Sequence, residues 1–218
     1  MKFKELNLPN KLTTIRMFCV PFMVVLFVLF LLHNNYNVPC DYKVVYSDVT
    51  SITVSLSVCQ IVMVVLFAFA SITDFVDGHL ARKHNIVSDY GKLMDPLADK
   101  LLVNTTIICM LASSMYVLNG EAGILSLISI IASIIVIARD IFVDALRMQA
   151  LKKNAVVPAT IWGKMKTATL MPGIMVLLLG SLSPILFILG LILMTLGGVF
   201  ALIGGVKYYI DLSKYIEV

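Results

Sequence analysis

Charged residues are scarce in this chain, and its cysteines form no motif. Asp, Glu, Lys and Arg together make up 14% of the 218 residues, whereas hydrophobic residues make up 60%. This composition excludes an ordinary soluble domain and predicts a helical membrane protein. The four cysteines include no CxxC pair, so the sequence indicates neither a zinc site nor a disulfide framework. It also has no long linker, low-complexity tract or repeat, and we expect a single domain over residues 1–218.

Long apolar runs dominate what the sequence does contain. About 20 apolar residues are enough for a helix to span the hydrocarbon core of a bilayer. Six runs reach this length: Thr13–Leu32, Ile52–Thr73, Leu93–Val117, Ile124–Leu146, Ile161–Ser181 and Pro184–Tyr208. The sequence therefore predicts an all-α integral membrane protein with six transmembrane helices. Before them, Met1 to Lys11 mixes apolar side chains with lysines and is expected to form a short interfacial segment.

Lysine and arginine accumulate in every second connection between these runs. The N-terminus, the connections after the second and fourth runs, and the C-terminus are basic, whereas the other connections carry few positive charges. The positive-inside rule then places both termini in the cytoplasm of a multi-pass protein of the cell membrane. The net charge of +4 suits an anionic membrane surface or anionic substrates, and it is not an argument for nucleic acid.

Four of the five aspartates between residues 74 and 99, where the second and third runs meet, recur at helical spacing, although carboxylates are costly at membrane depth. If both segments are helical, Asp74 and Asp77 share one face at i and i+3, and Asp95 and Asp99 share another at i and i+4. Pro96 is expected in a first helical turn. Donor sets made only of oxygen suit hard cations such as Mg²⁺, Mn²⁺ or Ca²⁺. Two such ions would bridge phosphate oxygens.

The aspartates belong to a longer pattern, D-x2-D-G-x2-A-R-x8-G-x3-D-x3-D. Eight fixed positions coincide by chance on the order of 10⁻¹⁰ per starting point, so interfacial aspartates paired with nearby lysines and arginines are the weaker interpretation. The pattern resembles the signature of the CDP-alcohol phosphatidyltransferases. The residues that carry it are Asp74, Asp77, Gly78, Ala81, Arg82, Gly91, Asp95 and Asp99.

The resemblance implies a six-helix membrane enzyme, usually a homodimer, that uses two Mg²⁺ or Mn²⁺ ions. By this resemblance Asp74, Asp77 and Asp95 bind the metals, and Asp99 is both a ligand and the general base. The cytidine diphosphate site would be lined by Gly78, Ala81 and Arg82. The active site would face the cytoplasm.

Three further stretches are similar to phosphatidylglycerophosphate synthases within that family: Leu8–Arg16, Ala138–Arg147 and Gly163–Thr167. This similarity implies that the phosphatidyl group of CDP-diacylglycerol passes to sn-glycerol 3-phosphate, with release of CMP. The cations expected to bind the acceptor phosphate are Arg139, Arg147, Lys164 and Lys166. An arginine in an apolar run is costly without an anionic partner. The alternative is that Asp140 or Asp144 pairs with Arg139 while the two lysines are positive-inside anchors.

Some assignments keep alternatives. Asn10, Thr13 and Arg16 would touch the nucleotide or its phosphates, or they are a helix cap and interfacial anchors. The spaced small residues Gly197, Ala201 and Gly205 indicate close helix packing within the bundle or a dimer face. The acceptor would otherwise be phosphatidylglycerol, an inositol phosphate or serine. A cation transporter, a different class of protein, predicts acidic residues throughout the membrane depth rather than at one end.

Overall fold

The architecture is helical in a computed structural model of the chain. The structure describes residues 8–36, 41–42, 56–84, 89–113, 115–116, 123–152 and 160–213. Within these ranges the backbone alone is described at 8–10, 12, 33–36, 41–42, 56–57, 74–84, 89–93, 95–96, 151–152 and 212. The predicted interfacial segment Met1 to Lys11 lies mostly outside the described residues.

The chain forms two compact units, which are described separately. Unit 1 comprises Met1–Met115 and Ser181–Pro184, and unit 2 comprises Tyr116–Gly180 and Ile185–Val218. The prediction of one domain over the whole chain stays a prediction.

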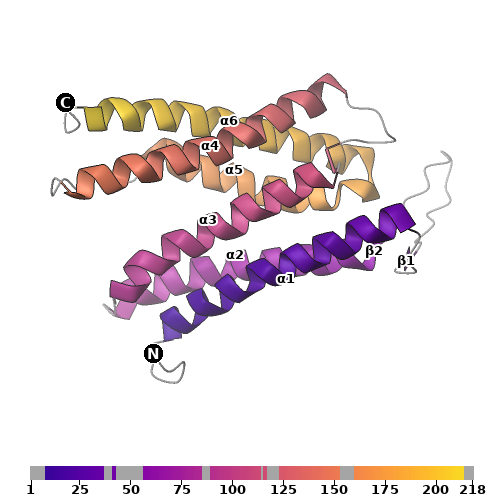
Figure 1. Cartoon of the computed structure of the whole chain (residues 1–218), viewed down its shortest axis with the longest axis horizontal. Helices are drawn as coiled ribbons and strands as arrows, with labels where there is room; N and C mark the ends of the chain where they lie inside the picture. Colours follow the sequence, from indigo (N-terminus) through magenta and orange to yellow (C-terminus); the bar gives the residue numbers. More distant parts are fainter. Residues whose placement is uncertain are drawn as a thin grey trace. The chain divides into compact units, whose positions relative to one another are not determined.

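Three helices form unit 1: α1 (Leu8–Tyr36), α2 (Val58–His84) and α3 (Asp89–Ala112). Helix α1 packs against both of the others, as Figure 1 shows. Its fully buried side chains include Thr13, Arg16, Met23 and Phe27, which recur at helical spacing along one face. The start of α1, the end of α2 and the start of α3 lie at the same end of this unit (Figure 1). The aspartate motif is carried by that end.

Two predicted boundaries in unit 1 are wrong. Residues just before α2 form the strand β2 (Leu56–Ser57), which pairs antiparallel with β1 (Asp41–Tyr42), so the helix begins at Val58 and not at Ile52. Apolar content alone does not separate a short strand from a helix. Helix α3 ends at Ala112 and not at Val117; just beyond it the Met115 N–H bonds the Met110 carbonyl at 3.3 Å, which is a wider turn than that of an α-helix.

The prediction for Pro96 is also wrong. Since α3 begins at Asp89, Pro96 is its eighth residue and not part of a first turn. A proline at this position has no N–H for the carbonyl four residues earlier. The helix nevertheless continues past it and carries Asp99.

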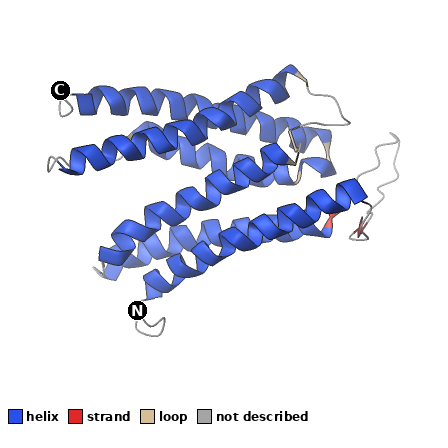
Figure 2. Ribbon diagram, viewed as in Figure 1, coloured by secondary structure: helices blue, strands red, loops and turns tan. Residues whose placement is uncertain are grey.

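Unit 2 contains three helices and a short 3₁₀ turn. They are α4 (Ile124–Lys152), α5 (Ile161–Leu178), η2 (Gly180–Leu182, shared at its end with unit 1) and α6 (Pro184–Ser213). Figure 2 shows how completely helix dominates the described residues.

Contacts along these helices fix their directions. Ser129 on α4 hydrogen-bonds Thr195 on α6 at 2.9 Å, and further on Arg147 donates to Tyr208, so α4 and α6 run parallel. Gly197 lies against Leu170 of α5 and Gly204 against Trp162, so α5 runs antiparallel to α6. The ends of α4 and α6 and the start of α5 therefore meet at one end of the unit.

The distribution of side chains is that of a membrane protein. Among the described residues, three helices are long and apolar enough to cross a bilayer, over Thr13–Leu32, Ile124–Ala150 and Pro184–Asp211, and α2 has a shorter apolar stretch, Val58–Thr73. Large apolar side chains are exposed, including Ile124 at 79% and Ile185 at 77%. Exposure of this kind suits lipid better than water. The prediction of a helical membrane protein is confirmed.

Candidate functional site

The first half of the aspartate motif lies on continuous helix. Helix α2 extends through Asp74, Asp77 and Arg82 to His84, so the backbone has the i, i+3 spacing that the sequence predicted. Gly78 and Ala81 belong to the same two turns. The side chains of this half lie outside the described residues, so the predicted metal and nucleotide contacts of α2 stay predictions.

Asp99 is the member of the motif whose side chain is described. It is partly buried, its Oδ1 is shielded from solvent, and it lies one turn after Asp95 on α3. Four carboxylates with no nitrogen or sulfur donor fit a hard divalent cation. Among the side chains that are described, no three His, Cys, Asp or Glu residues lie close enough to hold a metal. The predicted set of four carboxylates would suit a divalent cation by its chemistry, and its contacts stay a prediction.

The start of α1 supplies the other predicted nucleotide contacts. Thr13 is completely buried, and Arg16, one turn later on the same face, is 1% exposed. Asn10 is in the first turns of α1, but its side chain is outside the described set. Burial of Thr13 and Arg16 argues against a role as surface anchors. Whether Thr13 contacts a nucleotide stays a prediction.

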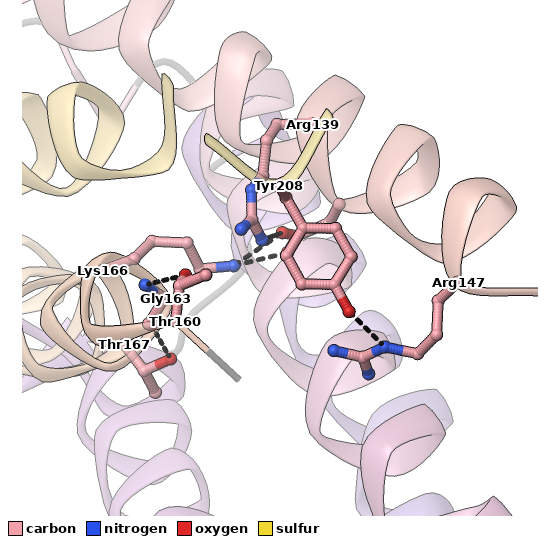
Figure 3. A network of polar contacts seen from close by, with 8 residues as sticks. Arg139, Arg147, Thr160, Gly163, Lys166, Thr167 and Tyr208 are labelled. Atoms are coloured by element: carbon pink, nitrogen blue, oxygen red, sulfur yellow. Dashed lines mark hydrogen bonds and ion pairs between the residues drawn. The ribbon is translucent and has the colours of Figure 1, made fainter. Parts of the chain in front are cut away.

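Two of the predicted acceptor-binding cations, Arg139 and Lys166, lie together around one buried carboxylate in unit 2 (Figure 3). Lys166 Nζ lies 2.6 and 2.7 Å from the two Asp140 oxygens, and Arg139 Nη1 donates to Asp140 Oδ1 at 3.1 Å. The exposed fractions of the side chains are 2% for Asp140, 10% for Lys166 and 13% for Arg139. The alternative that Asp140 pairs with Arg139 is therefore confirmed. Arg139 and Lys166 thus converge on one carboxylate in a poorly solvated place.

Helix α5 holds Lys166 in this position. Thr160 caps the helix, because its hydroxyl accepts a hydrogen bond from Gly163 N at 3.3 Å. The Thr167 hydroxyl donates to the Gly163 carbonyl at 3.2 Å. Lys166 is in the second turn, and its Nζ reaches the Asp140 carboxylate. Figure 3 shows its side chain pointing toward Arg139. Since Lys166 is buried in an ion pair, the alternative of a simple membrane-surface anchor does not fit it.

The two remaining predicted cations lie elsewhere. Arg147, two turns beyond Arg139 on α4, donates from Nε to the Tyr208 hydroxyl at 3.3 Å, and its guanidinium carbon is 5.7 Å from the Tyr208 ring centroid. Lys164 is exposed, and its spacing of two from Lys166 directs the two lysines to different faces of α5. The structure thus brings Arg139 and Lys166 together but not all four cations.

Sequence reasoning missed Tyr208 and the use made of Gly204 and Gly205. Tyr208 is 1% exposed. It contacts Arg147, from which it is separated by 61 positions in the sequence. Its one available signal was its spacing of three and four residues from the two glycines, which places it on the same side of the helix as each glycine.

A comparison with known protein families decides the family. The model of the CDP-alcohol phosphatidyltransferases matches residues 6–202 of the chain. The chain belongs to this family. The prediction drawn from the aspartate pattern is confirmed.

Several curated members of the family are similar in sequence to the chain. Proteins from Mycoplasma pneumoniae, Rickettsia bellii and Bacillus subtilis are each 33% identical to it and are each named CDP-diacylglycerol–glycerol-3-phosphate 3-phosphatidyltransferase. The aligned regions cover 77%, 83% and 81% of this chain. They cover 65% of the Mycoplasma protein, 79% of the Rickettsia protein and 78% of the Bacillus protein.

Proposed function

We propose that this phosphatidyltransferase moves the phosphatidyl group of CDP-diacylglycerol to sn-glycerol 3-phosphate, which gives phosphatidylglycerophosphate and CMP. The names of the three relatives support the acceptor. One structural observation carries the proposal: two largely buried cations, Arg139 and Lys166, converge at Asp140, and charge-assisted donors of this kind suit a phosphorylated acceptor. Arg139 Nε, shielded from solvent, donates no hydrogen bond within the described part of the chain, and a phosphate oxygen would accept from it.

The proposed roles follow the motif. Asp74, Asp77, Asp95 and Asp99 hold two divalent ions, Mg²⁺ or Mn²⁺. When bound, the metals supply positive charge at the diphosphate oxygens. The nucleotide is bound by Gly78, Ala81, Arg82, Asn10 and Thr13.

Asp99 accepts the proton of the attacking hydroxyl. That oxygen forms a bond to the lipid-linked phosphorus, the bond from phosphorus to the CMP oxygen breaks, and the electron pair leaves with CMP. Arg139 and Lys166 hold the acceptor phosphate directly, and Arg147 and Lys164, which lie elsewhere on α4 and α5, add to its binding by their charge. Because Asp140 fixes the directions of Arg139 and Lys166, part of the entropic cost of ordering two long side chains is met before the acceptor arrives.

The membrane arrangement is part of the proposal. The chain has six transmembrane helices, both termini in the cytoplasm and the active site facing the cytoplasm. Two copies form a homodimer. The parallel course of α4 and α6 supports this topology, because it gathers the basic residues of unit 2 at one end.

The test is CMP release by the purified protein with CDP-diacylglycerol and Mg²⁺, to which sn-glycerol 3-phosphate, phosphatidylglycerol, inositol phosphate or serine is added separately. We expect release only with sn-glycerol 3-phosphate. Release with another acceptor alone would overturn the assignment of Arg139 and Lys166 to the acceptor phosphate. Ion flux without CMP release would favour a transporter.

A further inference from the structure

One turn of α6, residues 204–208, contacts both predicted acceptor-binding arginines of α4. Gly204 and Gly205 lie beside Arg139, and Tyr208 lies beside Arg147. Because Tyr208 is four positions after Gly204 and three after Gly205, it lies on the same side of the helix as each glycine. They follow the last residue of the segment that matches the family model, which ends at 202.

The two glycines leave room for the side chain of Arg139. A Cβ at Gly205 would lie 3.0 Å from Arg139 Cγ and 3.7 Å from its Nε, and a Cβ at Gly204 would lie 3.4 Å from Nη2. The side chain of Arg139 thus lies against the backbone of α6 at two positions that have no side chain. This crossing is compatible with the 3.1 Å bond from its Nη1 to Asp140.

The surroundings show how a substitution at Gly205 would be absorbed. A groove of about 540 Å³ opens beside Gly205 and Arg139, lined by apolar side chains such as Phe142, Val206 and Tyr209. A methyl group at Gly205 would meet the flexible stem of Arg139 rather than the backbone of another helix. The stem has room to move toward the groove, and the guanidinium would move with it.

Tyr208 supports the second arginine in a different way. Its hydroxyl accepts the hydrogen bond from Arg147 Nε, and its ring lies under the guanidinium. The ring itself is buried with Val143, Leu146 and Ala150 of α4. A rigid aromatic anchored in this way holds the guanidinium in one place.

We propose that Gly204, Gly205 and Tyr208 are positioning residues that set the two α4 arginines for the acceptor phosphate. This inference rests on the proposed function and adds residues that act through Arg139 and Arg147 rather than on the substrate. The small-residue face of α6 therefore serves two purposes. Gly197 and Gly198 allow close packing against Leu170 and Ala132, and the last turn makes space for an arginine.

The test measures two quantities for each variant: the affinity for sn-glycerol 3-phosphate by calorimetry, and the KM of each substrate from CMP release. For Gly205→Ala we expect about fivefold weaker affinity and a fivefold higher KM for sn-glycerol 3-phosphate, because a shift of several tenths of an ångström misplaces the guanidinium. The KM for CDP-diacylglycerol and kcat should stay within about twofold of the wild type. Tyr208→Phe should weaken acceptor affinity about threefold, since it removes one hydrogen bond and keeps the ring.

Gly173→Ala is the matched control. Its new Cβ would lie 3.1 Å from Leu193 and 3.3 Å from Met194 across the α5–α6 contact, away from both arginines. We expect a lower melting temperature and unchanged acceptor affinity. If Gly173→Ala weakened acceptor affinity as much as Gly205→Ala, general loosening of the helices would explain both and the inference would be wrong.

A double-variant cycle isolates the contact. In an Arg139→Ala background the stem is absent, so Gly205→Ala should have no further effect on acceptor affinity. An equal effect in both backgrounds would overturn the inference. If Gly205→Ala alone does not fold, the Arg139→Ala background should restore folding, and failure to restore it would also count against the contact.

The two proposals fail separately. Wild-type protein that binds sn-glycerol 3-phosphate but releases no CMP would contradict the proposed function and leave the positioning role intact. Wild-type protein that releases CMP, with a Gly205→Ala variant of unchanged acceptor affinity, would contradict the positioning role alone.

Discussion

The aspartate motif of unit 1 and the basic cluster of unit 2 are encoded in different ways. The motif lies on two helices that follow each other in the chain, and its spacing of three or four residues is visible in the sequence. The cluster joins Arg139 of α4 to Lys166 of α5 through Asp140, and α6 supplies the surface beside it. A local site is thus recognised from spacing, whereas a site built from three separate helices needs the fold.

The two regions should also respond differently to perturbation. Loss of the motif should stop the chemical step, and loss of the cluster should weaken acceptor binding and stability.

Removal of divalent metal ions should have the largest effect. We expect a chelator to abolish CMP release and excess Mg²⁺ to restore it, because the ions proposed at the four aspartates supply positive charge at the diphosphate oxygens. The assay is CMP release before and after chelation, with metal content measured in parallel. Full activity in metal-free protein would contradict the assignment of the aspartates.

Asp99→Asn should reduce kcat by roughly 10³-fold while acceptor affinity stays near that of the wild type, because the amide cannot accept the proton. Steady-state kinetics and calorimetry separate the two quantities. Asn104→Ala, further along α3, is the control, since Asn104 Oδ1 accepts no hydrogen bond within the described part of the chain. A variant at Asp99 that raised KM and spared kcat would exclude the role of base.

Asp140→Asn should lower the free energy of unfolding by about 3 kcal/mol, because it leaves two poorly solvated cations without their shared carboxylate. Chemical unfolding in detergent measures the change. Adding Lys166→Met should recover part of the loss, since fewer buried charges then lack a partner. An unchanged unfolding free energy in the single variant would show that the cluster is better solvated than its exposure indicates.

Lys164→Ala should have the smallest effect, about a twofold rise in the KM for sn-glycerol 3-phosphate, because an exposed charge acts through water. Lys166→Met, at the buried position two residues away, should raise the same KM at least tenfold. An equal rise in this KM for the two variants would contradict the prediction that the buried lysine contributes more to acceptor binding than the exposed one.

The sequence predicted the helices better than their ends. The apolar run Thr13–Leu32 has the same bounds as the span found in α1, because hydrophobicity and length alone define it. The predicted start at Ile52 was wrong, because apolar content does not distinguish the short strand Leu56–Ser57 from the helix that follows it. The place of Pro96 was wrong because proline favours a first turn without requiring one.

The candidate site shows the same division. The sequence predicted Arg139 and Lys166 as acceptor-binding residues because each places a positive charge in an apolar segment. The structure adds that both contact the Asp140 carboxylate. No spacing along one helix indicates that Tyr208 contacts Arg147 or that Gly205 faces Arg139, since each pair spans two helices. The contacts of Gly197 and Gly198 support close packing within the bundle, and a dimer face on α6 stays a prediction.

The most direct test of the account is the fate of the attacking oxygen. The protein would be supplied with CDP-diacylglycerol and with sn-glycerol 3-phosphate that carries oxygen-18 in the terminal hydroxyl of the glycerol. The masses of both products would then be measured by mass spectrometry. The account predicts phosphatidylglycerophosphate that carries one oxygen-18 atom, and CMP that carries none. Labelled CMP, or a lipid product without the label, would contradict direct transfer to the acceptor hydroxyl.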